Sequence, residues 1–128
     1  MGDVVIARQT ILIVDDDAEL REAMLAVVRS GGYVAVGAGE GEAALTLLRE
    51  GLRPALIVLD LAMPGMDGEA FLRLRMTDRA IASIPVVVCS GREDASPIAR
   101  EMNAVANLKK PVDFDVLVRV VKLHCPAS

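Results

Sequence analysis

Three aspartates stand directly behind apolar runs of the sequence, at positions where buried strands would end. Asp15 and Asp16 follow the run at 10–14, and Asp60 follows the run at 55–59. The carboxyl ends of parallel strands meet at one edge of a sheet, so we expect these three carboxylates to lie together. Carboxylates held so close repel one another, and a hard cation with oxygen ligands, such as Mg²⁺, would offset that repulsion.

A hydroxyl group and an ammonium group follow two later apolar runs. Ser90 comes after the run at 84–89, and Lys109 and Lys110 come after the run at 104–108. In a parallel sheet these side chains reach the same edge as the acids. A metal on one side, with a hydroxyl and an ammonium group on the other, can hold a phosphoryl group from both sides.

The elements that must position these residues alternate along the chain. Short apolar runs predict strands, and amphipathic segments closed by glycine or asparagine predict helices. We expect Leu74 to face the core beside Phe71, and Ser96 to cap a short helix ahead of Pro97. The pattern predicts an α/β fold with a parallel, doubly wound sheet covered on both faces. The expected strands are 10–14, 33–36, 55–60, 84–89 and 104–108, and the expected helices are 18–30, 41–50, 67–77, about 96–103 and 113–124.

Composition limits the functions that fit. The 128 residues suffice for one domain, 53% of them are hydrophobic, and the formal net charge is −4. An acidic chain argues against a general nucleic-acid surface or an anionic membrane surface. The first ten residues lack the basic start of a signal peptide, and no apolar run approaches the length of a membrane span, about 20 residues. Two cysteines make no disulfide framework. We expect a cytoplasmic protein.

Four motifs together resemble those of response-regulator receiver domains, the CheY-like superfamily. The resemblance implies a flavodoxin-like (βα)5 fold with strand order 2-1-3-4-5. It also implies a single receiver domain over 1–128, with a core at about 10–124 and no effector domain. Because all four motifs occur in the family's order, the resemblance is far more specific than any one of them. The motifs are VDD at 14–16, LIVLDLAMPGMDG at 56–68, VVVCSG at 86–91 and KKP at 109–111.

The resemblance assigns roles to the acids. Asp60 would be the phosphoacceptor, which attacks a phosphohistidine of a sensor histidine kinase or a histidine phosphotransfer protein. Asp16 would bind Mg²⁺ directly and Asp15 would bind it through water. Ala62 would supply its backbone carbonyl oxygen as a further ligand. The protein would then signal by binding a downstream target protein, and it would catalyse only its own phosphorylation and dephosphorylation.

By the same resemblance, Ser90 would be the switch hydroxyl and Lys110 the phosphoryl-binding lysine. Lys110 matches better than Lys109 because the family's lysine directly precedes a proline, and the Lys110-Pro111 peptide bond would be cis. Three features depart from the family pattern. Asn107 replaces the usual aromatic residue, the segment that contains the fourth helix is about two residues short, and Ala62 and Arg92 occupy positions that tune the phosphoryl lifetime in the family.

The last predicted helix carries two apolar stripes. One of them would face the core. The other, formed by Val116, Val120 and Leu123, would lie roughly opposite. We hypothesise that this outer stripe docks a partner or a second copy of the chain as a homodimer.

Two alternative functions remain open. The D-x-D pattern at Asp15 and Asp17 is similar to that of haloacid-dehalogenase-like phosphatases, in which Asp15 would be the nucleophile. We prefer a helix-capping role for Asp17. The second alternative is a pseudo-receiver, a binding module that is never phosphorylated.

Overall fold

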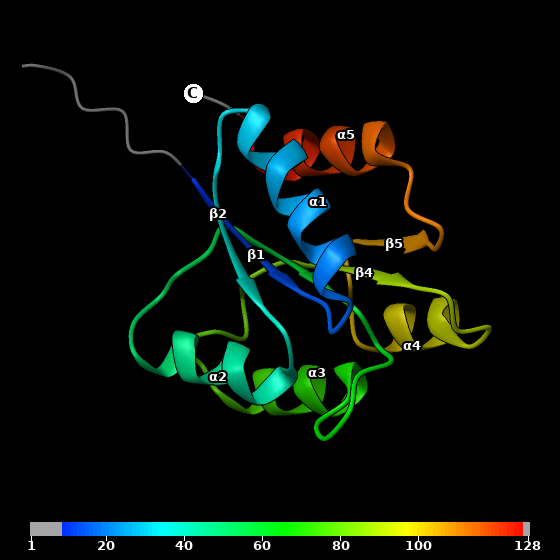
Figure 1. The fold of residues 1–128 in the computed structure, drawn as a ribbon. Coiled ribbons are helices and arrows are strands. Elements are labelled where there is room, and N and C mark those ends of the chain that lie inside the picture. The colour runs from blue at the N-terminus through cyan, green and yellow to red at the C-terminus, as the bar shows by residue number, and fades with distance from the viewer. Residues whose placement is uncertain (1–8, 127–128) are drawn as a thin grey trace, which may run out of the picture.

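The computed structural model describes residues 9–126. Five parallel strands form one sheet in the order β2-β1-β3-β4-β5. In Figure 1, α1 and α5 cover one face of the sheet, and α2, α3 and α4 cover the other. The predicted doubly wound fold and strand order are therefore confirmed. The strands are β1 (Thr10–Val14), β2 (Val34–Ala38), β3 (Leu56–Leu59), β4 (Val86–Ser90) and β5 (Ala106–Lys109). The helices are α1 (Ala18–Ser30), α2 (Gly41–Arg49), α3 (Gly68–Thr77), α4 (Ala95–Glu101) and α5 (Phe114–His124).

The sheet separates two hydrophobic cores because successive strand residues point to opposite faces. In β1, Leu12 and Val14 join the core beneath α2, α3 and α4, whereas Ile11 and Ile13 join the core beneath α1 and α5. The strands β3 and β4 are buried along their whole length. This is the burial expected of continuous apolar runs in a parallel sheet.

Aspartate side chains cap three of the helices through a hydrogen bond. The carboxylate of Asp17 accepts a hydrogen bond from the Leu20 backbone N–H of α1, at 3.1 Å. Asp67 and Asp113 cap α3 and α5 in the same way. The capping role preferred for Asp17 is therefore confirmed. Asn103, expected to end the fourth helix, adopts a left-handed backbone with φ of 58° just after α4.

Two predicted side-chain roles in the α3 and α4 regions are wrong. Leu74 is 40% exposed, and the neighbouring Arg75 is buried instead. The Arg75 Nε donates to the Ile84 carbonyl oxygen at 3.0 Å, which satisfies a backbone acceptor inside the protein. Ser96 does not cap α4, since Asp94 holds the capping position and makes no side-chain capping bond there.

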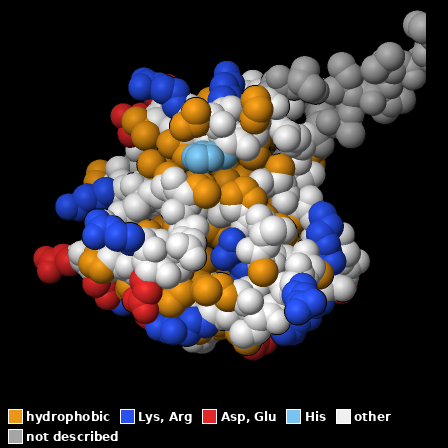
Figure 2. All heavy atoms as spheres, turned by 180° about the vertical axis from the view of Figure 1, so that it is seen from behind, with side chains coloured by type: hydrophobic (Ala, Val, Ile, Leu, Met, Phe, Trp, Pro, Cys, Tyr) orange, Lys and Arg blue, Asp and Glu red, His pale blue; other side chains and the backbone are white. Residues whose placement is uncertain are grey.

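The outer face of α5 is more closely packed than the stripe pattern predicts. Leu117 and Val121 are buried, and Leu123 is 74% exposed, as expected. Val120, however, packs partly against the core shared by α1 and α5. Val116 is also only partly exposed. On the face shown in Figure 2, hydrophobic side chains gather around the single histidine, which is the last residue of α5.

Within residues 9–126, every helix is too short or too polar to cross a lipid bilayer. The first ten residues, in which we expected no signal peptide, lie mostly outside the described part of the chain.

Candidate functional site

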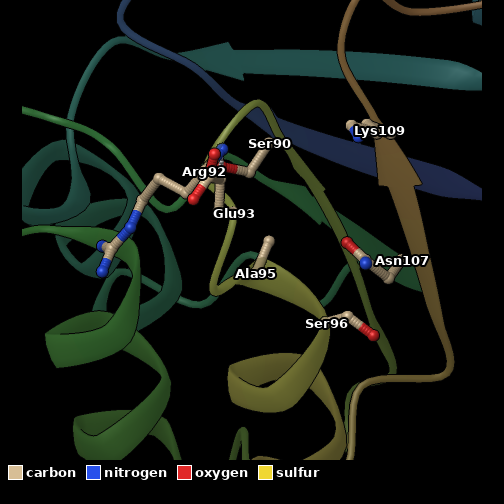
Figure 3. Close-up of a pocket in the computed structure, with 7 residues that line it drawn as sticks. All are labelled: Ser90, Arg92, Glu93, Ala95, Ser96, Asn107 and Lys109. Atoms are coloured by element: carbon tan, nitrogen blue, oxygen red, sulfur yellow. Dashed lines mark hydrogen bonds between the residues drawn. The ribbon is translucent and has the colours of Figure 1, made fainter.

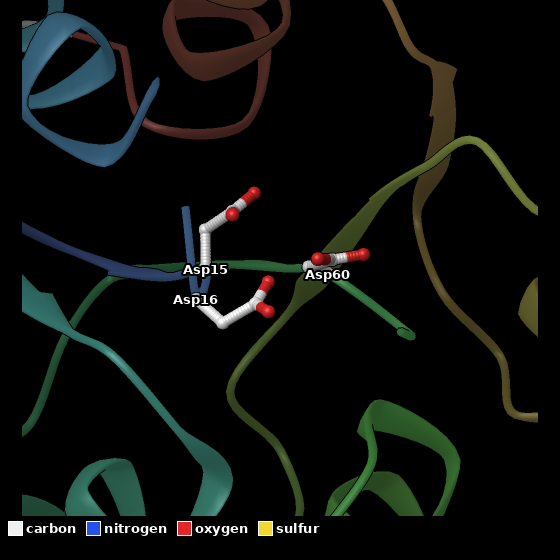
Figure 4. Close-up of side chains that lie close together, drawn as sticks. All are labelled: Asp15, Asp16 and Asp60. Atoms are coloured by element: carbon white, nitrogen blue, oxygen red, sulfur yellow. The ribbon is translucent and has the colours of Figure 1, made fainter. Parts of the chain in front are cut away.

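The three aspartates converge at the carboxyl ends of β1 and β3 (Figure 4). One carboxylate oxygen from each of Asp15, Asp16 and Asp60 lies within 4.8 Å of the others. The strand register explains this, because Val14 of β1 pairs with Leu59 of β3. The Asp60 N–H donates to the Val14 carbonyl oxygen at 2.9 Å. The residues that directly follow β1 and β3 therefore lie side by side. The expected meeting of the acids is observed.

Asp15 is fixed by a hydrogen bond at each of its polar groups. Its N–H donates to the Ala38 carbonyl oxygen at 3.1 Å, and its own carbonyl oxygen accepts from the Arg21 guanidinium at 2.7 Å. Its Oδ1 accepts from the Asp17 N–H at 2.9 Å, and its Oδ2 accepts from Lys110 Nζ at 2.8 Å. The Asp15 side chain is 1% exposed, and each of its carboxylate oxygens accepts a hydrogen bond.

Lys110 is the cation of the site. Its Nζ donates to Asp15 Oδ2 at 2.8 Å and to Asp60 Oδ2 at 3.2 Å. Burial by itself would lower the pKa of Lys110, but the hydrogen bonds and charges of the two carboxylates outweigh it and raise that pKa. Lys109 points elsewhere and is exposed, and the Lys110-Pro111 peptide bond is cis, as the family resemblance implied.

Asp60 is buried, with 4% of its surface exposed. Its Oδ1 accepts from the Ala62 N–H at 3.1 Å. Burial raises the pKa of Asp60 above its ordinary value, and the nearby Asp15 charge adds to that rise. The Ala62 N–H and Lys110 act in the opposite direction but do not cancel it. An added cation would therefore favour the ionised, nucleophilic form of this carboxylate.

Asp16 differs from its neighbours because its carboxylate is exposed and makes no hydrogen bond to any side chain or backbone group within residues 9–126. It is the acid free to bind a cation directly, whereas both oxygens of Asp15 are already engaged. The cluster offers only oxygen donors, which fits Mg²⁺. Ala62 contacts the site through its N–H group, and the role of its carbonyl oxygen stays a prediction.

Ser90 lies at the same edge, but its hydroxyl is turned to its own loop. The Ser90 Oγ accepts from the Arg92 N–H at 3.1 Å, and its carbonyl oxygen accepts from the Lys110 N–H at 3.2 Å. Beside it is a small cavity of about 130 Å³ (Figure 3), away from which Arg92 extends. Asn107 is exposed and lines one side of this cavity. The cavity is lined by Ser90, Arg92, Glu93, Ala95, Ser96, Asn107 and Lys109.

Two contributors to the site were not predicted: the Arg21 side chain and the Ala62 N–H group. Arg21 lies on a helix whose periodicity predicts only a polar, solvated position for it. The sequence feature that could have indicated the position of the Arg21 side chain is the pair Gly37 and Gly39 near the end of β2, because these glycines leave space beside that side chain.

The chain was compared with known proteins. The response regulator receiver domain family matches residues 11–122. The chain is 38% identical over 117 residues to the DNA-binding response regulator MtrA of Mycobacterium tuberculosis, with 90% of this chain and 50% of that protein covered. It thus spans about half the length of the first curated relatives it matches.

Two further matches extend over nearly the whole of both chains. Sporulation initiation phosphotransferase F of Bacillus subtilis is 34% identical over 119 residues, which are 92% of this chain and 94% of that protein. A response regulator receiver protein from Pseudomonas putida superposes with a TM-score of 0.86 at 33% identity, covering 93% and 99% of the two chains. Neither alternative function gains support from these matches. The chain therefore belongs to the response regulator receiver domain family and functions in two-component signal transduction.

Proposed function

We propose that Asp60 receives a phosphoryl group from a phosphohistidine of a sensor histidine kinase or a histidine phosphotransfer protein in the cytoplasm. Mg²⁺ would be held by Asp15, Asp16, Asp60 and the Ala62 carbonyl oxygen. The observation that carries the proposal is the contrast between two acids at this site. Asp60 is buried and held by Lys110 and the Ala62 N–H, and Asp16 beside it is unbonded.

In the transfer step, a carboxylate oxygen of Asp60 attacks the phosphorus atom. An O–P bond forms while the P–N bond to the donor imidazole breaks, and the imidazole nitrogen keeps the electron pair. Phosphorylation places about −1.5 to −2 charges on this edge of the sheet. The Lys110 ammonium and the Ala62 N–H already donate to Asp60. After the transfer, both donors would be close enough to bond the negatively charged phosphoryl oxygens. A bound magnesium ion would supply the remaining charge neutralisation. The chain would catalyse only its own phosphorylation and dephosphorylation.

Ser90 would convert the phosphoryl group into a conformational signal. To donate to a phosphoryl oxygen, its hydroxyl must leave the Arg92 N–H that it now accepts from. That exchange frees the start of the loop between β4 and α4. Because Asn107 stands where an aromatic side chain would otherwise respond, the loop and the open cavity beside Asn107 would carry the change to a downstream protein.

A second part of the proposal concerns partners. The match to a protein named as a phosphotransferase over most of both chains favours a phosphorelay, in which the chain acts through protein contacts and does not itself touch nucleic acid or membrane. We propose the end of the α5 stripe as a self-association surface. Leu123 is the most exposed large apolar side chain among the described residues, and Val120, Arg119 and Lys122 surround it.

The self-association surface is tested with Leu123→Asp, because the side chain is exposed and the substitution should not disturb the core. Sedimentation velocity on the phosphorylated protein should show a dimer that this substitution abolishes. A protein that remains monomeric at high concentration would contradict the proposal. Val120→Asp is a poorer test, since Val120 packs partly against the core.

The phosphoacceptor is tested by intact-mass spectrometry after incubation with acetyl phosphate. The wild-type protein should gain the mass of one phosphoryl group with Mg²⁺ and none after chelation, and Asp60→Asn should gain none. Asp15→Asn distinguishes the phosphatase alternative. An adduct that is lost only in Asp15→Asn would favour that enzyme, and the absence of any adduct in the wild-type protein would favour the pseudo-receiver.

A further inference from the structure

Arg21 reaches from the first turn of α1 to the base of the acid cluster. Its Nη1 donates to the Asp15 carbonyl oxygen at 2.7 Å, in a partly buried position. A long helical side chain leans toward the amino end of its helix, which here is the end next to the acids. The bond is short and has a charged donor, so it is among the stronger hydrogen bonds of this region.

The chain leaves space for this guanidinium. A Cβ atom at Gly37 would lie 3.2 Å from Arg21 Cδ, and one at Gly39 would lie 3.3 Å from Arg21 Nη1. Neither glycine has a positive φ angle, so the backbone conformation does not require glycine at either position. A side chain at Gly37 would meet Leu25 Cδ1, at 3.0 Å from the added Cβ, as well as Arg21, whereas one at Gly39 would meet Arg21 first.

The carbonyl that Arg21 holds belongs to the peptide unit joining Asp15 to Asp16. Since the peptide unit is planar, fixing this carbonyl fixes the direction in which the backbone enters Asp16. The Asp16 carboxylate has no hydrogen bond of its own within the described chain. Its position therefore depends on the backbone, whereas the Asp15 carboxylate is held directly by Asp17 and Lys110.

We propose that Arg21 is a positioning residue of the acid cluster: held in the space beside Gly37 and Gly39, it fixes the Asp15–Asp16 peptide and so aims the Asp16 carboxylate at the cation. The inference rests on the proposed magnesium site. It concerns geometry, since the charge of Arg21 alone has the opposite effect. A positive group near the acids opposes cation binding, so removing that charge alone would tighten Mg²⁺ binding.

The test is the affinity of the full chain for Mg²⁺ alone, measured by isothermal titration calorimetry without a phosphodonor. Arg21→Met should weaken binding about tenfold, the loss typical for groups that orient a metal ligand. Arg21→Lys, which can still donate to the same carbonyl oxygen, should restore most of the affinity. Mg²⁺ binding by Arg21→Met that equals or exceeds that of the wild-type protein would overturn the inference.

Arg29 provides a matched control on the same helix. Its Nη2 donates to the Ala35 carbonyl oxygen at 2.9 Å, also partly buried, near the start of β2 and at the far end of α1 from the acids. Arg29→Met should lower the free energy of unfolding without Mg²⁺ about as much as Arg21→Met does, yet leave Mg²⁺ affinity within about twofold. If Arg21→Met and Arg29→Met lost the same Mg²⁺ affinity, Arg21 would have only a general structural role.

Gly39→Ala keeps Arg21 but crowds its guanidinium, and it serves if Arg21→Met does not fold. It should weaken Mg²⁺ binding about twofold to threefold. Unchanged affinity in a folded Gly39→Ala protein would count against the inference. If the wild-type protein fails to bind Mg²⁺, the proposed function is overturned as well. If the wild-type protein binds Mg²⁺ and the Arg21 and Gly39 variants bind it with the same affinity, only the role of Arg21 is overturned.

Discussion

The two halves of the functional edge are built differently. At the ends of β1 and β3, Asp15 has all its polar groups bonded, and Lys110 joins it to Asp60. At the ends of β4 and β5, the Ser90 hydroxyl bonds only its own loop, and Asn107 is exposed. The helix α4 that follows Ser90 has seven residues and no side-chain cap, and no residue of β5 is fully buried.

This difference separates chemistry from signalling. A carboxylate that must attack phosphorus needs a fixed position, and the β1–β3 half supplies it before any phosphoryl group arrives. A segment that must change conformation needs few fixed side-chain contacts, and after β4 the Ser90 hydroxyl bonds only its own loop and α4 has no side-chain cap. Substitutions in the first half should therefore change stability and cation binding, whereas those in the second should change the response to phosphorylation.

The largest effect on stability is expected from Lys110→Met. It leaves two buried carboxylates without their cation, so the free energy of unfolding should fall by about 2 kcal/mol. The loss should be smaller than for a fully buried pair because 23% of the Lys110 side chain is exposed. Urea unfolding without Mg²⁺ measures it, and the matched control Lys109→Met should change stability by less than about 0.5 kcal/mol. Equal losses of unfolding free energy in both variants would contradict the view that Lys110 stabilises the two buried carboxylates.

A smaller effect, of the opposite sign, is expected from Asp60→Asn. Burial raises the pKa of Asp60, so its ionised form costs stability at neutral pH, and the amide should stabilise the protein by about 1 kcal/mol. A raised pKa means that the folded state binds the proton more readily than the unfolded chain. The advantage of Asp60→Asn should therefore shrink as pH falls from neutrality through the raised pKa. Urea unfolding of both proteins across that range measures the difference, and an advantage that grows toward low pH would contradict this account.

The smallest effect on stability is expected from Ser90→Ala, which removes one hydrogen-bond acceptor and should lower the free energy of unfolding by about 0.5 kcal/mol, the low end of the usual range. Its Mg²⁺ affinity should stay within about twofold of the wild-type value. Phosphorylation should still occur, but the accompanying changes in backbone amide chemical shifts around Asn107 should be lost. Ser96→Ala, on the same cavity, is the control. Preserved shifts in Ser90→Ala would show that the β4–β5 half responds without this hydroxyl.

Much of the fold was predictable because local pattern and tertiary structure agree. Continuous apolar runs predicted the central strands, and acids at their ends predicted the cluster, since parallel strands share one carboxyl edge. Strand β2 was predicted at 33–36 but extends over Val34–Ala38, because Gly37 and Ala38 pair with β1 in a way their own propensities do not indicate.

The errors concern side chains whose roles depend on one particular polar partner, which hydrophobic periodicity does not indicate. Arg75 is buried because the Ile84 carbonyl oxygen needs a donor, and hydrophobic periodicity carries no information about that need. Asp94 begins α4, and its carboxylate pairs with Arg92 at 2.7 Å, which left no capping role for Ser96. Arg21 was missed for the same reason, since its partner is a carbonyl group at the end of β1.

The most direct test of the central claim is to locate the phosphoryl group. After incubation of the wild-type protein with acetyl phosphate and Mg²⁺, borohydride reduction converts an aspartyl phosphate to homoserine, which peptide mass spectrometry can place. We predict homoserine at position 60 and unmodified aspartate at positions 15 and 16. Homoserine at position 15, or no modification at any of the three, would contradict the account.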